Sequence, residues 1–218
     1  KKTDILIIGL GLAGMTAAIT AAKSGKKIII ITKTGSLQSG NTPWAQGGIV
    51  YKGLNDSPEK LKKDILDAGA GHCWEEAVDH LCEYGPSLVK KILLGNLKTK
   101  FDKTDNELNR VAEGAHSDPR VIYNQDKTGL SIHQSALQHL QQLDNVEILT
   151  NHTAIDLLTF SHHSAVSTDI YKKPACFGAM VLNHKNDVIP ILSSKTILAT
   201  GGLGQLFMHT TNPKEATG

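Results

Sequence analysis

A short stretch in the middle of the chain holds residue types that serve in acid–base chemistry. Glu113, His116 and Ser117 bring together a carboxylate, a possible base and a hydroxyl, and Arg120 adds a cation shortly afterwards. Catalytic acids and bases are drawn mostly from such groups. The same residues also fit a capped turn before a helix, in which Glu113 pairs with Arg120 and polar side chains cap backbone amides. This stretch alone does not decide between the two interpretations.

A second candidate site is a glycine-rich hexapeptide near the N-terminus. Its residues are Gly9, Leu10, Gly11, Leu12, Ala13 and Gly14. Residues 5–8 before it form an unbroken apolar run, which predicts a strand buried on both faces of a parallel sheet. Residues 15–23 predict a helix that ends at Ser24-Gly25, and residues 27–32 predict a second strand. The sequence therefore predicts a β-α-β unit of the kind that binds dinucleotides.

Each glycine of the hexapeptide has a separate task in such a unit. Gly9 allows the tight turn out of the strand, Gly11 lets the backbone approach a pyrophosphate, and Gly14 lets the helix lie close to the strand. A plain strand-to-helix turn gives the same glycine pattern, but the flanking elements favour cofactor binding. Where an Asp or Glu usually binds the ribose, the chain has Thr32-Lys33-Thr34. An NAD-selecting carboxylate is absent there, so FAD is favoured.

Composition narrows the classes of partner. The 218 residues are 40% hydrophobic and carry a net charge of +2, and no Lys/Arg cluster is interleaved with aromatic residues, which argues against a nucleic-acid partner. No apolar run approaches the ~20 residues that cross a bilayer, so we expect no membrane partner and a cytoplasmic location. The three cysteines lack C-x-x-C spacing, and His162-His163 lies in a polar stretch, so no disulfide or metal site is expected.

The rest of the chain predicts an α/β fold, Rossmann-like, with a parallel sheet, helical insertions and β-hairpins. Around Trp44 and Gly47-Gly48, a loop of small and polar residues suggests backbone amides lying against a planar ligand. The further expected elements are a helix opened by Ser57-Pro58, two helices at 74–84 and 86–94 separated by Gly85-Pro86, a hairpin around 103–106, a helix at 128–143, a strand at 146–149, a hairpin of 177–182 with 188–192, and a buried strand at 195–199.

Six motifs occur in one order along essentially the whole chain. They are residues 9–14, Asn41-Thr42-Pro43-Trp44-Ala45-Gln46-Gly47-Gly48-Ile49, Glu113-Gly114-Ala115-His116-Ser117, Asp126-x-Thr128-Gly129, Ala199-Thr200-Gly201-Gly202 and Thr210-Thr211-Asn212-Pro213. Together they resemble the fumarate reductase and succinate dehydrogenase flavoprotein superfamily. The Glu-Gly-x-His-Ser block is similar to the branch that oxidises L-aspartate, because the succinate-handling relatives differ there.

The resemblance implies roles for individual residues. Glu113 would stand over the flavin and orient the α-amino group of the substrate. The implied FAD contacts are Leu10 to Ala13 at the pyrophosphate, Lys33 near the adenosine, Asn41, Thr42, Pro43, Trp44, Ala45, Gln46, Gly47 and Gly48 along the isoalloxazine, and Ala199, Thr200 and Gly201 as a second backbone contact.

The chain also departs from the superfamily pattern. Neither Asn41 nor Thr42 is the histidine that binds flavin covalently in membrane-bound relatives, so FAD is expected to be non-covalent. Ala115 replaces an expected glycine, which would shift the turn if a positive φ were needed. Gly218 falls inside what resembles a Thr-Gly-Asp-Gly motif. We therefore expect residues 1–218 to be the N-terminal FAD-binding domain, with capping and helical domains and the ligands of the substrate carboxylates outside them.

The implied reaction is removal of a hydride from the α-carbon of L-aspartate by the flavin, which gives iminoaspartate, with oxygen or fumarate as electron acceptor. This would be the first step of quinolinate and NAD biosynthesis, with hand-over of iminoaspartate to quinolinate synthase. Three alternatives remain open. They are a soluble fumarate reductase or succinate dehydrogenase-like flavoprotein, an inactive FAD-binding fragment, and an NAD-dependent dehydrogenase, which Thr32 and Lys33 disfavour.

Overall fold

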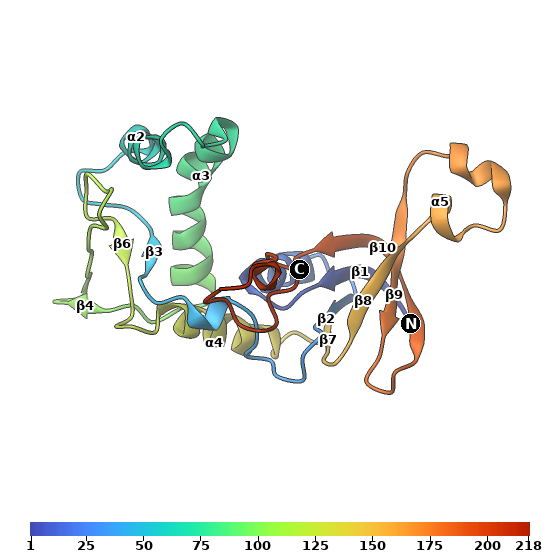
Figure 1. The fold of residues 1–218 in the computed structure, drawn as a ribbon. Coiled ribbons are helices and arrows are strands. Elements are labelled where there is room, and N and C mark those ends of the chain that lie inside the picture. Colours follow the sequence, from blue (N-terminus) through green and yellow to red (C-terminus); the bar gives the residue numbers. More distant parts are fainter. The chain divides into compact units, whose positions relative to one another are not determined.

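The computed structural model describes residues 1–218, and the chain forms two units (Figure 1). Unit 1 consists of Lys1–Thr42 and Ala136–Gly218, and unit 2 consists of Pro43–Ser135. Helix α4 (Thr128–Leu140) carries the chain from unit 2 back into unit 1, and it ends slightly before the predicted boundary at residue 143. No helix in the described chain has the length and apolar character needed to span a membrane.

Unit 1 is built on a six-stranded sheet in the order β7-β2-β1-β10-β9-β8. Strands β7 (Val146–Leu149), β2 (Ile28–Ile31), β1 (Lys2–Ile8) and β10 (Val188–Leu198) are parallel, whereas β9 (Cys176–Leu182) and β8 (Thr153–Thr159) continue the sheet antiparallel. The predicted β-α-β unit is confirmed: α1 (Leu12–Ala22) connects β1 to β2 and packs on both. Because β2 and β10 flank β1, the strand order reverses at β1.

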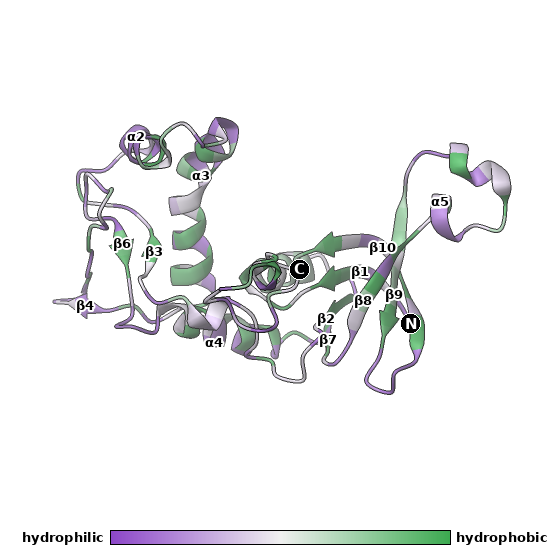
Figure 2. Ribbon diagram, in the orientation of Figure 1, coloured by the Kyte–Doolittle hydropathy of each residue, from purple (hydrophilic) through white to green (hydrophobic).

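The core of unit 1 is formed by apolar side chains of the strands in its six-stranded sheet. Alternate residues of β1 and β2 cluster with apolar residues of β9 and β10; the buried members are Leu6, Ile8, Ile29, Ile31, Ala179, Val181 and Ile191. The residues between these, such as Ile7 and Ile30, are buried as well. They point to the other face of the sheet, because successive side chains of a strand point to opposite faces. Figure 2 shows β1 and β9 mostly in the hydrophobic colour. All four consecutive isoleucines of β2 are buried, so this strand is covered on both of its faces.

Strand β10 corrects one expectation. The sequence predicts separate strands at 188–192 and 195–199, but β10 is continuous, pairing antiparallel with β9 in its first half and parallel with β1 from residue 192 onward. The intervening serines stay in the ladder: Ser193 pairs with Thr3, and its Oγ lies 3.0 Å from Oγ1 of Thr196. The expected burial was also wrong, since Lys195 and Leu198 are exposed.

The polar stretch between β8 and β9 contains two short helical turns, α5 (Phe160–His163) and η3 (Ser167–Tyr171), which lie beyond the ends of those strands in Figure 1. Phe160 packs edge-on against Phe177 with ring centroids 4.6 Å apart, and the Lys172 ammonium lies 4.9 Å from the Phe160 ring. The two histidines of α5 are exposed, as expected from their polar surroundings.

Unit 2 contains α2 (Pro58–Gly69), α3 (Glu75–Leu88), a π-helical turn η2 (Val89–Asn96), and the short strand pairs β3 (Ile49–Val50) with β6 (Val121–Ile122) and β4 (Lys103–Thr104) with β5 (Glu107–Leu108). Helix α2 begins as predicted, since the Ser57 hydroxyl accepts a hydrogen bond from the Lys60 amide at 3.3 Å. A small core forms where α2 and α3 pack together, from Leu61, Val78 and Cys82. The predicted β4–β5 hairpin is also confirmed.

The predicted break at Gly85-Pro86 was wrong, because α3 continues through both residues to Leu88 and directly into η2. Proline fixes a φ that a helix tolerates, so its cost is the missing N–H and ring crowding at the preceding turn. The wider π turn that follows changes the hydrogen-bond pattern at this point. Trp74, the N-cap residue of α3, is 72% exposed.

Candidate functional site

A cavity of about 450 Å³ opens in unit 1 at the carboxyl ends of β1, β2 and β10. In open α/β sheets, ligands bind at this edge, where the strand order reverses. The volume is in the range of small-molecule and cofactor sites. Of the predicted cofactor residues, those lining the cavity are Gly9, Leu10, Gly11, Leu12, Ala13, Lys33, Asn41, Thr42, Ala199, Thr200 and Gly201. Three segments far apart in the sequence therefore meet at one cavity.

The first glycine turn has the conformation that its pattern predicts. Packing within the protein explains two of its glycines, and ligand access explains the third. Gly9 has a φ of 115°, and a Cβ there would lie 2.2 Å from the Ala199 carbonyl oxygen. Gly14 does not line the cavity; it lies where α1 meets the turn, and a Cβ there would lie 2.0 Å from the Gly9 carbonyl oxygen. At Gly11 the nearest protein atom to a Cβ would be 3.8 Å away. Packing within the protein therefore does not require Gly11, whereas close approach of a ligand would.

The N-terminus of α1 faces this cavity without a negative charge of its own. Gly11 is the N-cap and offers no capping side chain, and the first turn contains no acidic residue. The Leu12 amide donates to Thr42 Oγ1 at 3.1 Å. The remaining N–H groups and the positive end of the helix dipole suit an anion such as a pyrophosphate.

The other end of the cavity is bordered by the segments that follow β2 and β7. Thr32 is buried and donates its amide to the Leu149 carbonyl at 2.9 Å, while the Lys33 ammonium contacts the Thr217 hydroxyl. His152, which sequence reasoning did not single out, also lines the cavity, and its Nδ1 lies 2.7 Å from the Thr150 carbonyl oxygen. Its position three residues after the strand predicted at 146–149 could have identified it, since the carboxyl ends of parallel strands meet at one edge of a sheet.

The second glycine turn lies where the sequence predicts it. The Ala199 amide donates to the Ile8 carbonyl at 2.8 Å, which fixes the end of β10 beside the first turn. Gly201 has a φ of 80°, a conformation that favours glycine.

The predicted flavin loop passes from one unit into the other. Asn41 and Thr42 belong to unit 1, whereas residues 43–48 belong to unit 2. There, Ala45 accepts a hydrogen bond from the Gly129 amide at 2.8 Å, and Trp44 is 71% exposed. The fold itself requires glycine at position 48. Its φ is 129°, and a Cβ there would lie 2.4 Å from Val121 Cγ1. The contact of this loop with a planar ligand stays a prediction.

Glu113 lies in a tight turn of unit 2, and its side chain is exposed. The His116 amide donates to the Glu113 carbonyl at 2.9 Å, and the Glu113 amide donates to His116 Nδ1 at 3.4 Å. A Cβ on Gly47 would lie 3.6 Å from Glu113 Oε1, so the carboxylate lies beside the predicted flavin loop. Ala115 does not have a positive φ, so the missing glycine strains nothing.

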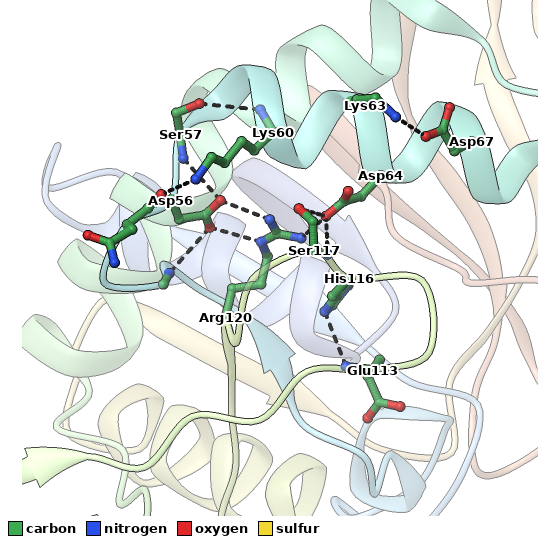
Figure 3. A network of polar contacts seen from close by, with 12 residues as sticks. Asp56, Ser57, Lys60, Lys63, Asp64, Asp67, Glu113, His116, Ser117 and Arg120 are labelled. Atoms are coloured by element: carbon green, nitrogen blue, oxygen red, sulfur yellow. Dashed lines mark hydrogen bonds and ion pairs between the residues drawn. The ribbon is translucent and has the colours of Figure 1, made fainter.

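Arg120 does not pair with Glu113, so the ion pair considered in the sequence analysis was wrong. Its guanidinium is fully buried and donates to Asp56 through Nε and Nη2, each at 2.8 Å, and to Asp64 through Nη1 at 2.5 Å (Figure 3). The hydrogen bond from Arg120 lowers the pKa of Asp56. Hydrogen bonds from the Ser117 amide and from Arg120 lower the pKa of Asp64 to about 2. Both carboxylates are therefore ionised at neutral pH, and each nitrogen of the Arg120 guanidinium donates to one of them.

A parallel sheet whose first turn, helix N-terminus and second glycine turn converge on one cavity defines a dinucleotide-binding domain of the flavoprotein class. The chain belongs to the family described as an FAD binding domain, whose model matches residues 4–218. Its cofactor is FAD, and the residues that line the cavity fit that assignment.

Comparison with known proteins extends the likeness over the whole chain. The chain is 36% identical to L-aspartate oxidase of Halobacterium salinarum, covering 99% of this chain and 41% of the relative. It is 37% identical to the chloroplastic L-aspartate oxidase of Oryza sativa subsp. japonica, covering 100% of this chain and 32% of the relative. The chain thus spans less than half the length of these relatives.

Solved structures agree with the fold. A variant of E. coli quinol fumarate reductase superposes with a TM-score of 0.85 at 24% identity, covering 99% of this chain and 35% of that one. The Mycobacterium smegmatis Sdh1 complex in its apo form gives a TM-score of 0.85 at 22% identity, covering 100% of this chain and 37% of that one. These likenesses concern the fold alone.

Proposed function

We propose that residues 1–218 are the FAD-binding domain of an enzyme that oxidises L-aspartate to iminoaspartate, with oxygen or fumarate as the electron acceptor. Similarity to L-aspartate oxidases over essentially the whole chain supports this proposal. The structural observation that carries it concerns the Glu113 carboxylate, namely its exposure and its freedom from Arg120. Its carboxylate is exposed and is not neutralised by Arg120, which binds two other carboxylates.

In this proposal, FAD is held without a covalent bond, and the cavity of unit 1 supplies the contacts to its pyrophosphate and adenosine. The amides of the first glycine turn and the N-terminus of α1 would bind the pyrophosphate. The Lys33 ammonium would add a positive charge near the adenosine end. Bound FAD accepts two electrons, and the protein supplies placement and charge.

The role of Glu113 follows from charge. L-aspartate carries an ammonium on the carbon that is oxidised, and a carboxylate accepts short, charge-assisted hydrogen bonds from such a group. Succinate and fumarate have no amine, so a carboxylate at this position gives them no contact. Glu113 would therefore distinguish aspartate from the dicarboxylates that resemble it. We also infer from the family resemblance that iminoaspartate passes to quinolinate synthase.

Glu113→Gln in the full-length enzyme tests the assignment, because it preserves side-chain size and removes the charge. We expect kcat/KM for L-aspartate to fall by about 10- to 100-fold, since hydrogen bonds to charged groups contribute about 1.5–3 kcal/mol. Fumarate reduction by the same protein should stay within about twofold. Glu107→Gln, on the exposed β4–β5 hairpin, is the matched control and should change neither activity.

Equal losses with both substrates would remove Glu113 from amine recognition. Anaerobic bleaching of the bound flavin by succinate but not by L-aspartate would instead favour a fumarate reductase or succinate dehydrogenase-like activity. The absorbance bands of bound flavin serve as the measurement in both cases.

A further inference from the structure

We propose that Asp64 is a positioning residue: through Ser117 it fixes the turn that presents Glu113 to the substrate amine. This inference rests on the proposed role of Glu113 and extends it to a residue on a different element. Asp64 lies in the middle of α2, a helix that belongs to the same unit as the turn.

One carboxylate oxygen of Asp64 carries the connection. Oδ2 accepts hydrogen bonds from the Ser117 amide at 2.8 Å and from the Ser117 hydroxyl at 2.9 Å. The same oxygen accepts from Arg120 Nη1 at 2.5 Å. Asp64 is buried, so these are charge-assisted bonds in a site with little competing water. The backbone and the side chain of Ser117 are therefore fixed to α2 together.

The turn transmits this restraint to Glu113 because it closes on itself directly before Ser117. His116 donates its amide to the Glu113 carbonyl and accepts the Glu113 amide at its ring nitrogen. Figure 3 shows Ser117 at the Asp64 end of the turn and the Glu113 carboxylate at the other end, directed away from the Arg120 network. The anchored end is thus separate from the end that would meet a ligand.

The anchor itself is held on its far side. Arg120 is bound to Asp56 through two parallel hydrogen bonds, and Asp56 accepts the amides of Gly53 and Ser57 at 3.2 and 3.0 Å. Ser57 is the N-cap of α2, so the network connects both the start and the middle of that helix. A displacement of α2 would therefore move Ser117 with it.

A purely structural role would have a different signature from a positioning role. Loss of a structural contact lowers stability and affects every substrate alike. Loss of a contact that positions Glu113 affects the amine-bearing substrate selectively, because only that substrate uses the Glu113 carboxylate. The two roles separate when L-aspartate oxidation, fumarate reduction and thermal stability are measured on the same variants.

Ser117→Ala in the full-length enzyme is the test, because it removes one of the three hydrogen bonds to Asp64 and keeps the amide. We expect KM for L-aspartate to rise about fivefold, which corresponds to about 1 kcal/mol for one hydrogen bond. KM and kcat for fumarate and the FAD content should stay unchanged, whereas Tm should fall slightly, because the same hydrogen bond also stabilises unit 2. Ser117→Thr, which keeps a hydroxyl, should restore the KM. Ser87→Ala is the control, since its hydroxyl bonds a backbone carbonyl on exposed α3.

The double variant of Ser117→Ala and Glu113→Gln tests whether the two residues act through the same contact. Coupled residues give non-additive effects, so Ser117→Ala should add nothing in the Glu113→Gln background. Additive effects, or equal losses with both substrates, would overturn the positioning role while Glu113 keeps its own. A Glu113→Gln variant that loses both activities equally would overturn the proposed function, and the role of Asp64 with it.

Discussion

Gly14 lies directly against the backbone of Gly9, so closely that a Cβ on Gly14 would be 2.0 Å from the Gly9 carbonyl oxygen. The start of α1 and the turn that leaves β1 are therefore a single packed element. Neither can shift without moving the other, and the cavity lining depends on both.

Gly14→Ala should consequently destabilise unit 1 and weaken FAD binding. We expect a loss of about 1–3 kcal/mol in the free energy of unfolding, because added volume forces a backbone shift in a packed site. The control is Gly202→Ala: Gly202 lines the cavity, whereas Gly14 does not, but Gly202 lacks a positive φ and has no atom within 4 Å of a Cβ. Urea unfolding and the loss of flavin fluorescence on binding measure the two effects. Similar behaviour of both variants would contradict this account of Gly14.

Arg120→Met should be strongly destabilising. It leaves Asp56 and Asp64 as two carboxylates without their cation, and loss of one partner of a buried ion pair typically costs about 3–5 kcal/mol. Lys63→Ala removes an exposed ion pair on α2 and should leave stability almost unchanged. Denaturant midpoints of both variants decide the matter. Comparable midpoints would show that the network contributes little to the stability of unit 2.

Acid should weaken the fold through the same two carboxylates. Asp64 has a pKa of about 2 in the folded protein against an ordinary value of 3.8, and the pKa of Asp56 is also lowered. A depressed pKa means that the stabilisation is present above about pH 4 and is lost as pH falls toward about 2. Denaturation measured between pH 5 and pH 2 should show this decline, and Asp64→Asn should make it shallower. An identical slope in that variant would exclude Asp64 as its source.

Gly85→Ala should stabilise the protein, in contrast to the other glycine change. Gly85 lies inside α3, has no positive φ, and a Cβ there would lie 3.9 Å from Leu81 Cγ, which is an ordinary contact. Alanine in a helix interior is favoured over glycine by about 0.5–1 kcal/mol. A rise in Tm of the full-length protein is the expected result. A fall would mean that the transition from α3 to η2 needs the freedom of glycine.

The β-α-β unit and its cavity could be predicted because their signals are local. Four apolar residues before Gly9 and four isoleucines in β2 indicate buried parallel strands, and glycine spacing places the turn between them. The parallel ends of such strands meet at one edge, so the position of Ala199 and Gly201 beside the first turn followed as well.

The features that were mispredicted depend on tertiary contacts. Arg120 is bound by Asp56 and Asp64, which are far away in sequence, so local reasoning pointed to the nearby Glu113 instead. Gly85-Pro86 has low helix propensity, but packing of α3 against α2 overrides it. His152 carries no motif of its own, and only the sheet order brings it to the cavity.

The central position of β1 has a consequence for synthesis of the chain on the ribosome. Strand β2 follows β1 within a few turns of helix, but β10, the other neighbour of β1, emerges only after residue 188. Until then the nascent β1 has an open, strongly apolar edge, and such edges recruit other strands. The sheet around β1 therefore cannot be completed before most of these 218 residues have been synthesised.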